Sequence, residues 1–359
     1  MPINKFLGEI KRKKGVVSKN LIREGVERVT ETSYRKGEKE IGGKLSKESI
    51  RKEVLKSGKK ADKLKKTKKK EVEIKEKALK DAGTSKATYK KNGGGIIRRI
   101  AGKLFKRYAL YLLVDGVGVA IQEDEAWEDN KRANSEKEEK TKTRECKLAV
   151  FLKQTEEKIE EIGTFCTWER VGKFSNILQG ILIKIYSKIY PVVIISDGAK
   201  WIRQLRRRIR VLKYAKWILD WFHLKDHLEK MLRTMQIEEG NKIWEELIEH
   251  FWNGETGMAL KKINEIKLSR KKKDREKEQE AREEFVTYVN NQIEGIVNYK
   301  EYKEKGYLIG SGYIEKRNDV MIKQRMVRGH RIRWGKKGGE AMMALLTAKY
   351  NDRMDEVFA

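Results

Sequence analysis

Three acidic residues lie in sequence contexts that could bring them together for chemistry. Asp115 occurs within LYLLVDGVGVAIQ, Asp197 within VVIISDGAKWI and Glu315 within LIGSGYIEKRND. Each aspartate follows an apolar, strand-like run and precedes a glycine, so its carboxylate is expected where a buried strand ends and backbone can approach closely. Three carboxylates at one place supply the hard oxygen ligands that a pair of Mg²⁺ ions needs, and Mn²⁺ accepts the same ligands. The residues therefore predict a two-metal centre suited to phosphate esters.

Each of these residues also has a structural explanation. An Asp-Gly pair is a common turn at the end of a strand. Asp319 lies one helical turn beyond Glu315 and competes with it for the role of third ligand. The functional interpretation is favoured because both aspartates share one setting, and it requires a topology that makes their strands neighbours.

A second group of polar residues lies in LDWFHLKDHL, which contains Asp220, His223 and His227. The two histidines are four residues apart, so they share a helical face. A metalloprotease is excluded, because Leu224 stands where an HExxH motif needs its glutamate. A zinc site and a helix with two surface histidines are the alternatives. We favour a structural or substrate-positioning role for Asp220 and His223 beside the acidic residues.

The charge of the chain identifies the class of partner. The 359 residues include 84 Lys and Arg against 54 Asp and Glu, which gives a formal net charge of +30. Such an excess favours nucleic acid as the partner, with an acidic membrane surface as the weaker alternative. No apolar run is long enough to span a bilayer, and the N-terminus has no signal-peptide pattern, so a cytoplasmic, nucleoid-associated protein of a prokaryote is expected. Cys146 and Cys166, the two cysteines, are expected to be buried and unpaired.

The elements that must position the acidic residues follow a recognisable order. From about residue 107, three strand patterns are followed by a helix, a strand, a helix and a further strand. This βββαβαβ order is that of the ribonuclease-H-like α/β fold, in which the first and fourth strands are neighbours. Asp115 lies on the first strand and Asp197 on the fourth. We predict a catalytic domain over 107–350, interrupted by a helical insertion at about 228–308.

Residues 1–58 predict a helical DNA-binding region. A short helix pattern ends at Gly42-Gly43, and a second helix is expected from Lys47, with Ser46 as its N-cap. Two helices joined by a tight glycine turn are typical of a helix-turn-helix. The DNA-contacting side chains would then be Lys47, Arg51 and Lys52. A plain helical hairpin with a solvated basic face is the alternative.

Two further segments are basic. Residues 59–106 are rich in lysine and poor in large apolar residues, and are expected to be a linker that adds electrostatic affinity. Near the C-terminus, Arg325, Arg328 and Trp334 combine guanidinium groups with an aromatic ring, which suits phosphate contact and base stacking. A solvated basic helix end explains the arginines as well.

Five motifs in order resemble those of a known family. VDGVGVAIQ, ISDGAKWI, LDWFHLKDH, GSGYIE and RMVRGHRIRWGKKGGEAMMALL are similar to the ISLre2 family of insertion-sequence transposases, which are UPF0236-type proteins related to mutator-like DDE transposases. The resemblance covers most of the chain from about residue 14. It implies that Asp115, Asp197 and Glu315 form a DDE triad, and that Asp220 and His223 match the [C/D]xxH signature of mutator-like enzymes.

The resemblance also implies an activity and its partners. It implies a homodimer or larger assembly that binds terminal inverted repeats in double-stranded DNA, cuts with two Mg²⁺ ions and joins the freed ends to target DNA. Two alternatives stay open: a shortened, non-catalytic DNA-binding remnant, and a structure-specific nuclease of the same fold.

Overall fold

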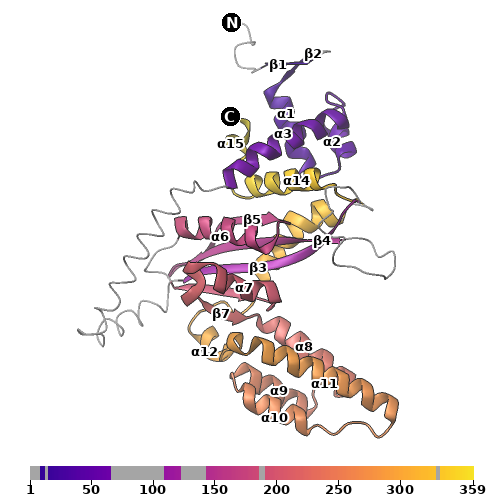
Figure 1. The fold of residues 1–359 in the computed structure, drawn as a ribbon, viewed down its shortest axis with the longest axis vertical. Coiled ribbons are helices and arrows are strands. Elements are labelled where there is room, and N and C mark those ends of the chain that lie inside the picture. Colours follow the sequence, from indigo (N-terminus) through magenta and orange to yellow (C-terminus); the bar gives the residue numbers. More distant parts are fainter. Residues whose placement is uncertain (1–8, 13–14, 66–108, 123–142, 186–190, 329–331) are drawn as a thin grey trace, which may run out of the picture.

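The computed structural model describes residues 9–12, 15–65, 109–122, 143–185, 191–328 and 332–359. Figure 1 shows three regions stacked along the longest axis: N-terminal helices, a central sheet with its helices, and a helical extension. Residues 66–106 of the expected linker lie outside the described residues.

A mixed five-stranded sheet forms the centre. Its strand order is β5-β4-β3-β6-β7, with β3 antiparallel to β4 and parallel to β6. The strands are β3 (Ala109–Ala120), β4 (Thr143–Gln154), β5 (Ile159–Thr167), β6 (Val192–Ser196) and β7 (Lys216–Leu219). The predicted order of elements and the pairing of the first strand with the fourth are both confirmed, and the sheet is consistent with a ribonuclease-H-like core.

The sheet is buried on both faces because its strands are almost continuously apolar. Along β3, alternate residues belong to two separate hydrophobic clusters, Tyr111 and Leu113 to one and Leu112 and Val114 to the other. One face is covered by α6 (Val171–Ile185), α7 (Lys200–Arg208) and the 3₁₀ helix η3 (Arg210–Tyr214). The opposite face is covered by α13 (Gly312–Arg317), the π-helix η5 (Asn318–Val327) and α14 (Lys336–Lys349).

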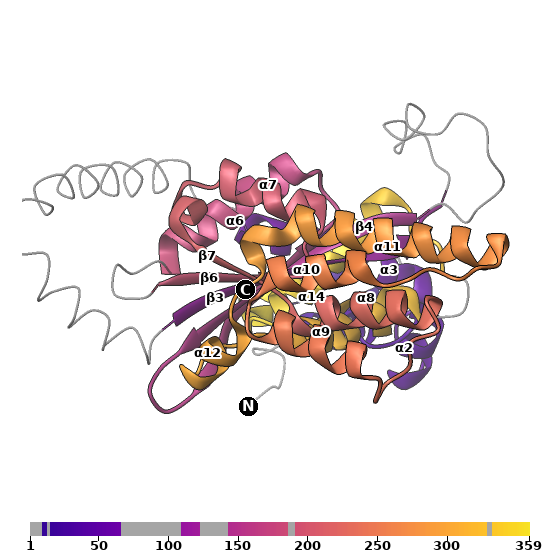
Figure 2. The same cartoon turned by 90° about the horizontal axis from the view of Figure 1, so that it is seen from below.

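The helical insertion begins directly after the last strand. Its elements are α8 (Trp221–Thr234), α9 (Lys242–Trp252), α10 (Thr256–Glu265), α11 (Lys272–Gln292), η4 (Ile293–Gly295) and α12 (Tyr299–Glu304). They extend away from the sheet as a separate helical layer (Figure 1), and in the view from below α8 to α11 lie nearest the viewer (Figure 2). Tyr299 anchors the layer, since its hydroxyl donates to the carbonyl of Leu219 at 3.0 Å and its ring packs 5.0 Å from that of Trp221.

The N-terminal helices are α1 (Lys19–Val29), α2 (Tyr34–Glu40) and α3 (Lys47–Lys65), preceded by the short β1 (Glu9–Arg12) and β2 (Gly15–Ser18). The turn between α2 and α3 passes through Gly42 and Gly43 at φ +66° and +69°, which glycine adopts without strain. Ser46 caps α3, its hydroxyl oxygen accepting from the backbone N–H of Ser49 at 3.2 Å. The predicted pair of helices and its glycine turn are confirmed, but α3 runs seven residues past the expected boundary (65 − 58).

α3 docks on the C-terminal helix α14, which lies between it and the sheet (Figure 1). Contact is close: a Cβ atom on Gly58 would lie 2.4 Å from the Cβ of Ala341, and one on Gly339 would collide with the ring of Trp168. Small residues let the backbones approach, so the N-terminal helices and one face of the sheet share a single hydrophobic cluster. The last helix, α15 (Met354–Phe358), packs beside α3.

Both cysteines are buried and neither is in a disulfide, as expected. Among the residues that the structure describes, no helix is long and apolar enough to cross a membrane.

Candidate metal centre

The sheet sets Asp115 beside Asp197. Leu113 pairs with Ile195 across the parallel strands β3 and β6, and each aspartate lies two residues further along the chain. The expectation that both aspartates end their strands holds for Asp197, which directly follows β6, but is wrong for Asp115, because β3 continues to Ala120 through its pairing with β4. Neighbouring strands are about 4.8 Å apart and alternate residues share a face, so the two carboxylates emerge on one side of the sheet. That side is the one occupied by Leu113 and Ile195, which faces α13 and η5.

Short hydrogen bonds fix both aspartates. Asp115 Oδ1 accepts from the backbone N–H of Gly116 at 2.7 Å, and its Oδ2 accepts from the side-chain amide of Asn318. Asp197 Oδ1 accepts from the N–H of Ala199 at 2.9 Å. These partners are uncharged N–H groups, so they orient the carboxylates but supply no positive charge to balance them.

The pKa of Asp115 reflects this crowding. Burial raises it above its ordinary value, and the charge of Asp197 raises it further, against the opposing hydrogen bonds from Gly116 and Asn318 and the charge of His223. A bound cation would favour the charged form of such a carboxyl group and so lower its pKa.

Glu315 reaches the same region from α13, which packs over β3. Its Oε1 accepts from the hydroxyl of Ser311 at 2.9 Å and lies 3.8 Å from Nε2 of His223. One ligand atom from each of Asp220, His223 and Glu315 lies within 4.8 Å of the others, so this group could hold a metal ion. The competing Asp319 instead pairs with Arg328 at the surface.

Asp220 is fully buried and joins two segments. Its Oδ1 accepts from the backbone N–H groups of Phe222 and His223, capping α8, and its Oδ2 accepts from the N–H of Ser311 at 2.5 Å. The carboxylate therefore holds the start of α8 against the turn that begins α13. It positions His223 and Glu315 together.

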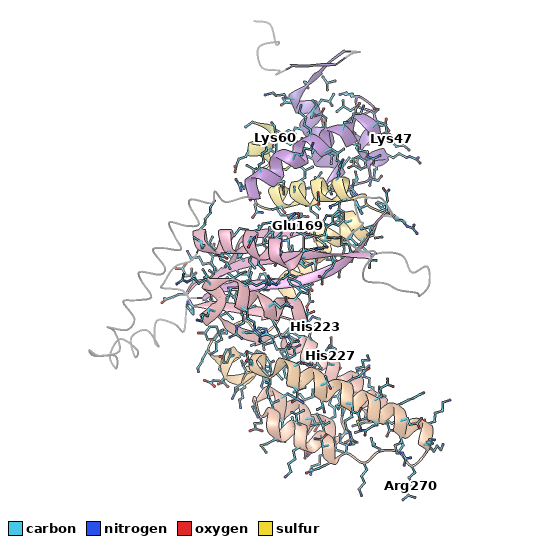
Figure 3. All side chains as sticks on the ribbon, viewed as in Figure 1. Lys47, Lys60, Glu169, His223, His227 and Arg270 are labelled. Carbon is cyan, nitrogen blue, oxygen red and sulfur yellow. The ribbon has the colours of Figure 1, made fainter. Side chains whose placement is uncertain are left out.

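His227 lies apart from this group. Its ring stacks on Tyr288 of α11, with centroids 4.1 Å apart, and both histidines lie where the sheet meets the insertion (Figure 3). Among the described residues, the group that could hold a metal ion is Asp220, His223 and Glu315. The zinc site considered from the sequence had His227 in place of Glu315.

Two residues of the candidate metal centre were not predicted from the sequence. Asn318 lies three residues after Glu315, a spacing that puts both on one helical face and could have revealed it. Gln292, at the end of α11, donates from Nε2 to the carbonyl of Gly198 at 2.7 Å and so holds the loop after Asp197. No local pattern indicates Gln292, because its partner is 94 residues away.

The basic residues predicted on α3 are exposed. Lys52 is exposed, and Lys47 and Arg51, also exposed, line a groove that Gly338 of α14 shares. Figure 3 labels Lys47 near one end of the helix and Lys60 near the other. The exposed basic stripe is longer than predicted, since it continues through Lys56, Lys59, Lys60 and Lys63.

Two of the three residues predicted near the C-terminus, Arg325 and Trp334, are engaged in packing. Arg325 is 4% exposed, its Nε donates to the carbonyl of Val29, and its guanidinium lies 4.8 Å from the ring centroid of Trp334. Burial lowers the pKa of Arg325 to about 10. Trp334 is 5% exposed, with Nε1 donating to the carbonyl of Met326 at 3.1 Å. Neither side chain is accessible to DNA in this arrangement, so the predicted DNA contact is wrong for Arg325 and Trp334. Arg328 is exposed and pairs with Asp319 at the surface, so its predicted DNA contact stays a prediction.

Comparison with known proteins gives one match. The model of an uncharacterised protein family, UPF0236, matches residues 99–356, which include every candidate ligand above. Searches among curated proteins and among solved structures find no match.

Proposed function

The chain belongs to the uncharacterised protein family UPF0236, and from the geometry of its acidic cluster we propose that it is a DNA transposase of an insertion sequence. In this proposal the sheet and its helices are a ribonuclease-H-like catalytic core. Asp115, Asp197 and Glu315 are the catalytic carboxylates.

One observation carries the proposal: the register of β3 and β6 sets Asp115 beside Asp197, under the helix that bears Glu315. Two aspartates on neighbouring parallel strands with a glutamate from a covering helix suit two divalent ions that share a phosphate. The charge of +30 supplies the affinity for a polyanion.

The residues fit Mg²⁺ or Mn²⁺. Asp115 and Asp197 offer carboxylate oxygens on one face of the sheet, and Glu315 Oε1 is held by Ser311. Asp220 is less suited to binding a metal, because three backbone N–H groups already occupy its oxygens. Bound ions would activate the attacking hydroxyl and neutralise charge on the phosphate.

The reaction proposed is hydrolysis followed by strand transfer. Water attacks the phosphorus at each element end and breaks its bond to the 3′-oxygen of the element strand, which leaves as a 3′-hydroxyl. That hydroxyl then attacks a phosphorus of target DNA and displaces the 3′-oxygen of the target strand, which leaves as a new 3′-hydroxyl. His223, 3.8 Å from Glu315, would position the substrate phosphate. Lys47, Arg51 and Lys52 on α3 would contact the terminal inverted repeats, and cutting paired ends requires at least a dimer on DNA.

The experiment is cleavage of a labelled duplex that carries an end of the parent element, with Mg²⁺ or Mn²⁺, by wild type and Asp197→Ala. We expect nicking at the element boundary that requires metal and is lost in the variant, while binding to the duplex is retained. Binding without nicking by wild type would identify a DNA-binding remnant. Cutting of branched DNA without sequence preference would identify a nuclease. Either result contradicts the proposal.

A further inference from the structure

A basic groove lies on the other side of the loop that follows Asp197. It encloses about 900 Å³ and is formed by α7 and η3 on one side and by the end of α11 with η4 on the other. Its lining contains seven lysines and arginines but a single acidic residue, Glu294. Trp217 of the edge strand β7 is buried at its floor.

A hydrogen bond and an ion pair link the two walls of the groove. Arg203 donates to the carbonyl of Asn291 at 2.5 Å, and Arg206 pairs with Glu294 at 3.0 Å. The remaining cations include Arg207, Arg208 and Arg210, which are exposed and have no ion pair within the described part of the chain. The two walls of the groove are thus linked to each other, and several of its positive charges are not balanced by a carboxylate that the structure describes.

The helix dipole does not explain this concentration of charge. Cations stabilise the last turn of a helix, which accounts for Arg206, Arg207 and Arg208. Lys200 and Arg203, however, occupy the first turn of α7, where the dipole disfavours cations, and Arg210 lies beyond the helix. Seven like charges around one cavity repel one another, and a polyanion relieves that repulsion.

We propose that this groove binds the phosphate backbone of duplex DNA beside the acidic cluster. The assignment rests on the proposed function and adds a second DNA site to it. The groove begins near the acidic cluster, since Lys200 follows Asp197 by three residues and Gln292, which holds Gly198, adjoins the groove residue Asn291. A duplex carries a charge about every 1.7 Å of its axis, so α7, about 13 Å long, faces several phosphates.

Binding of a labelled duplex of arbitrary sequence, measured by fluorescence anisotropy over a range of salt without divalent metal, tests the groove. The groove variant is Arg207→Ala/Arg208→Ala/Arg210→Ala. Its matched control is Lys271→Ala/Lys273→Ala/Lys277→Ala, three exposed cations beside Arg270 at the far end of the insertion (Figure 3). We expect the groove variant to bind about tenfold more weakly and to lower the slope of log affinity against log salt by about 2 to 3, since each phosphate contact contributes about 0.9.

The two cysteines of the chain are buried, so a new surface cysteine provides a specific probe. Arg207→Cys should form a disulfide with a duplex that carries a thiol tether on its backbone, and Lys273→Cys should do so far less. Equal weakening by the two triple variants, equal crosslinking at the two positions, or tighter binding of duplex RNA than duplex DNA would each overturn the assignment.

These outcomes are separate from those of the catalytic proposal. Wild type that binds DNA through the groove but never cuts element ends would contradict the transposase and leave the groove standing. Wild type that cuts element ends while the groove variant binds and crosslinks normally would overturn the groove alone.

Discussion

The two sides of the loop after β6 carry opposite charge and are built differently. On the side of α13, Asp115 and Asp197 are partly buried and fixed by backbone and amide N–H groups within 2.9 Å. Glu315 is exposed there, but the hydroxyl of Ser311 holds its carboxylate. On the side of α7, arginines such as Arg207 and Arg208 are exposed on long side chains. Metal ligands must be held in place, whereas phosphate attraction requires only charge within reach. In the proposed function, chemistry belongs to the first side and DNA affinity to the second.

The largest effect should come from removing one carboxylate on the acidic side. Asp197→Asn should lower metal-dependent cleavage at least about 1,000-fold, equivalent to about 4 kcal/mol, because it removes a proposed metal ligand. Single-turnover cleavage and anisotropy on the same preparation measure this, with DNA affinity unchanged. Glu294→Gln, which removes a carboxylate from the groove, is the control and should cut normally. Equal losses of cleavage in Asp197→Asn and Glu294→Gln would contradict the proposed difference between the two sides.

The loop between the two sides should be next in sensitivity. Gly198 has φ +84°, and a Cβ there would lie 2.5 Å from Cδ of Gln292. Gly198→Ala should therefore destabilise the protein by about 1–3 kcal/mol and reduce cleavage. Urea unfolding monitored by tryptophan fluorescence provides the measurement. In Gly172→Ala, whose added Cβ meets nothing within 4 Å, stability should be unchanged or slightly higher. Similar losses in both variants would show that Gly198 has no special role.

Adding charge to the acidic side should sharpen the contrast. Asn318 is 1% exposed and donates to Asp115, so Asn318→Asp brings a further carboxylate against that group. The metal-free variant should lose about 1–3 kcal/mol of stability, and Mg²⁺ should restore part of it. Thermal unfolding with Mg²⁺ and with chelator measures this. Asp319→Asn, at the surface pair with Arg328, should be nearly neutral. No response of Asn318→Asp to Mg²⁺ would argue against a cation beside Asp115.

The smallest effect should be a pH dependence at the junction with the insertion. Burial lowers the pKa of His227 from its ordinary 6.5, and the charge of His223 lowers it further. The unfolded chain then takes up the proton more readily than the folded one, so stability is lost as pH falls through 6.5 toward the folded pKa. His227→Gln should reduce the fall in melting temperature between neutral and acidic pH. His250→Gln, at the surface pair with Glu255, is the control. An unchanged acid response in His227→Gln would remove His227 as its source.

The sequence revealed the parts of the site whose signal is local. The apolar runs before the two Asp-Gly pairs indicated the strands, and the order of elements indicated their pairing, because strand period and connection rules operate over short distances. The end of β3 was not indicated, since this strand continues past Asp115 to Ala120 through its pairing with β4. Ser46 and the glycines before it gave the start of α3.

Long-range packing explains what the sequence did not reveal. Arg325 and Trp334 have the composition of a DNA-binding surface, yet they pack against Val29, Tyr34 and Met326 from distant or neighbouring segments. Composition does not distinguish an exposed arginine from one stacked between rings. Gln292 and the groove along α7 were missed for the same reason, since the insertion that forms one wall folds back from about 90 residues away.

The most direct measurement is affinity cleavage with Fe²⁺, which takes the place of Mg²⁺ and, with a reductant and peroxide, cuts the polypeptide next to the bound ion. Fragment ends mapped by mass spectrometry should cluster near Asp115, Asp197 and Glu315, decrease when Mg²⁺ competes, and disappear in Asp197→Asn. Cuts confined to His223 and Glu315 that persist in Asp197→Asn, or cuts that Mg²⁺ does not suppress, would contradict a metal centre built on the paired aspartates.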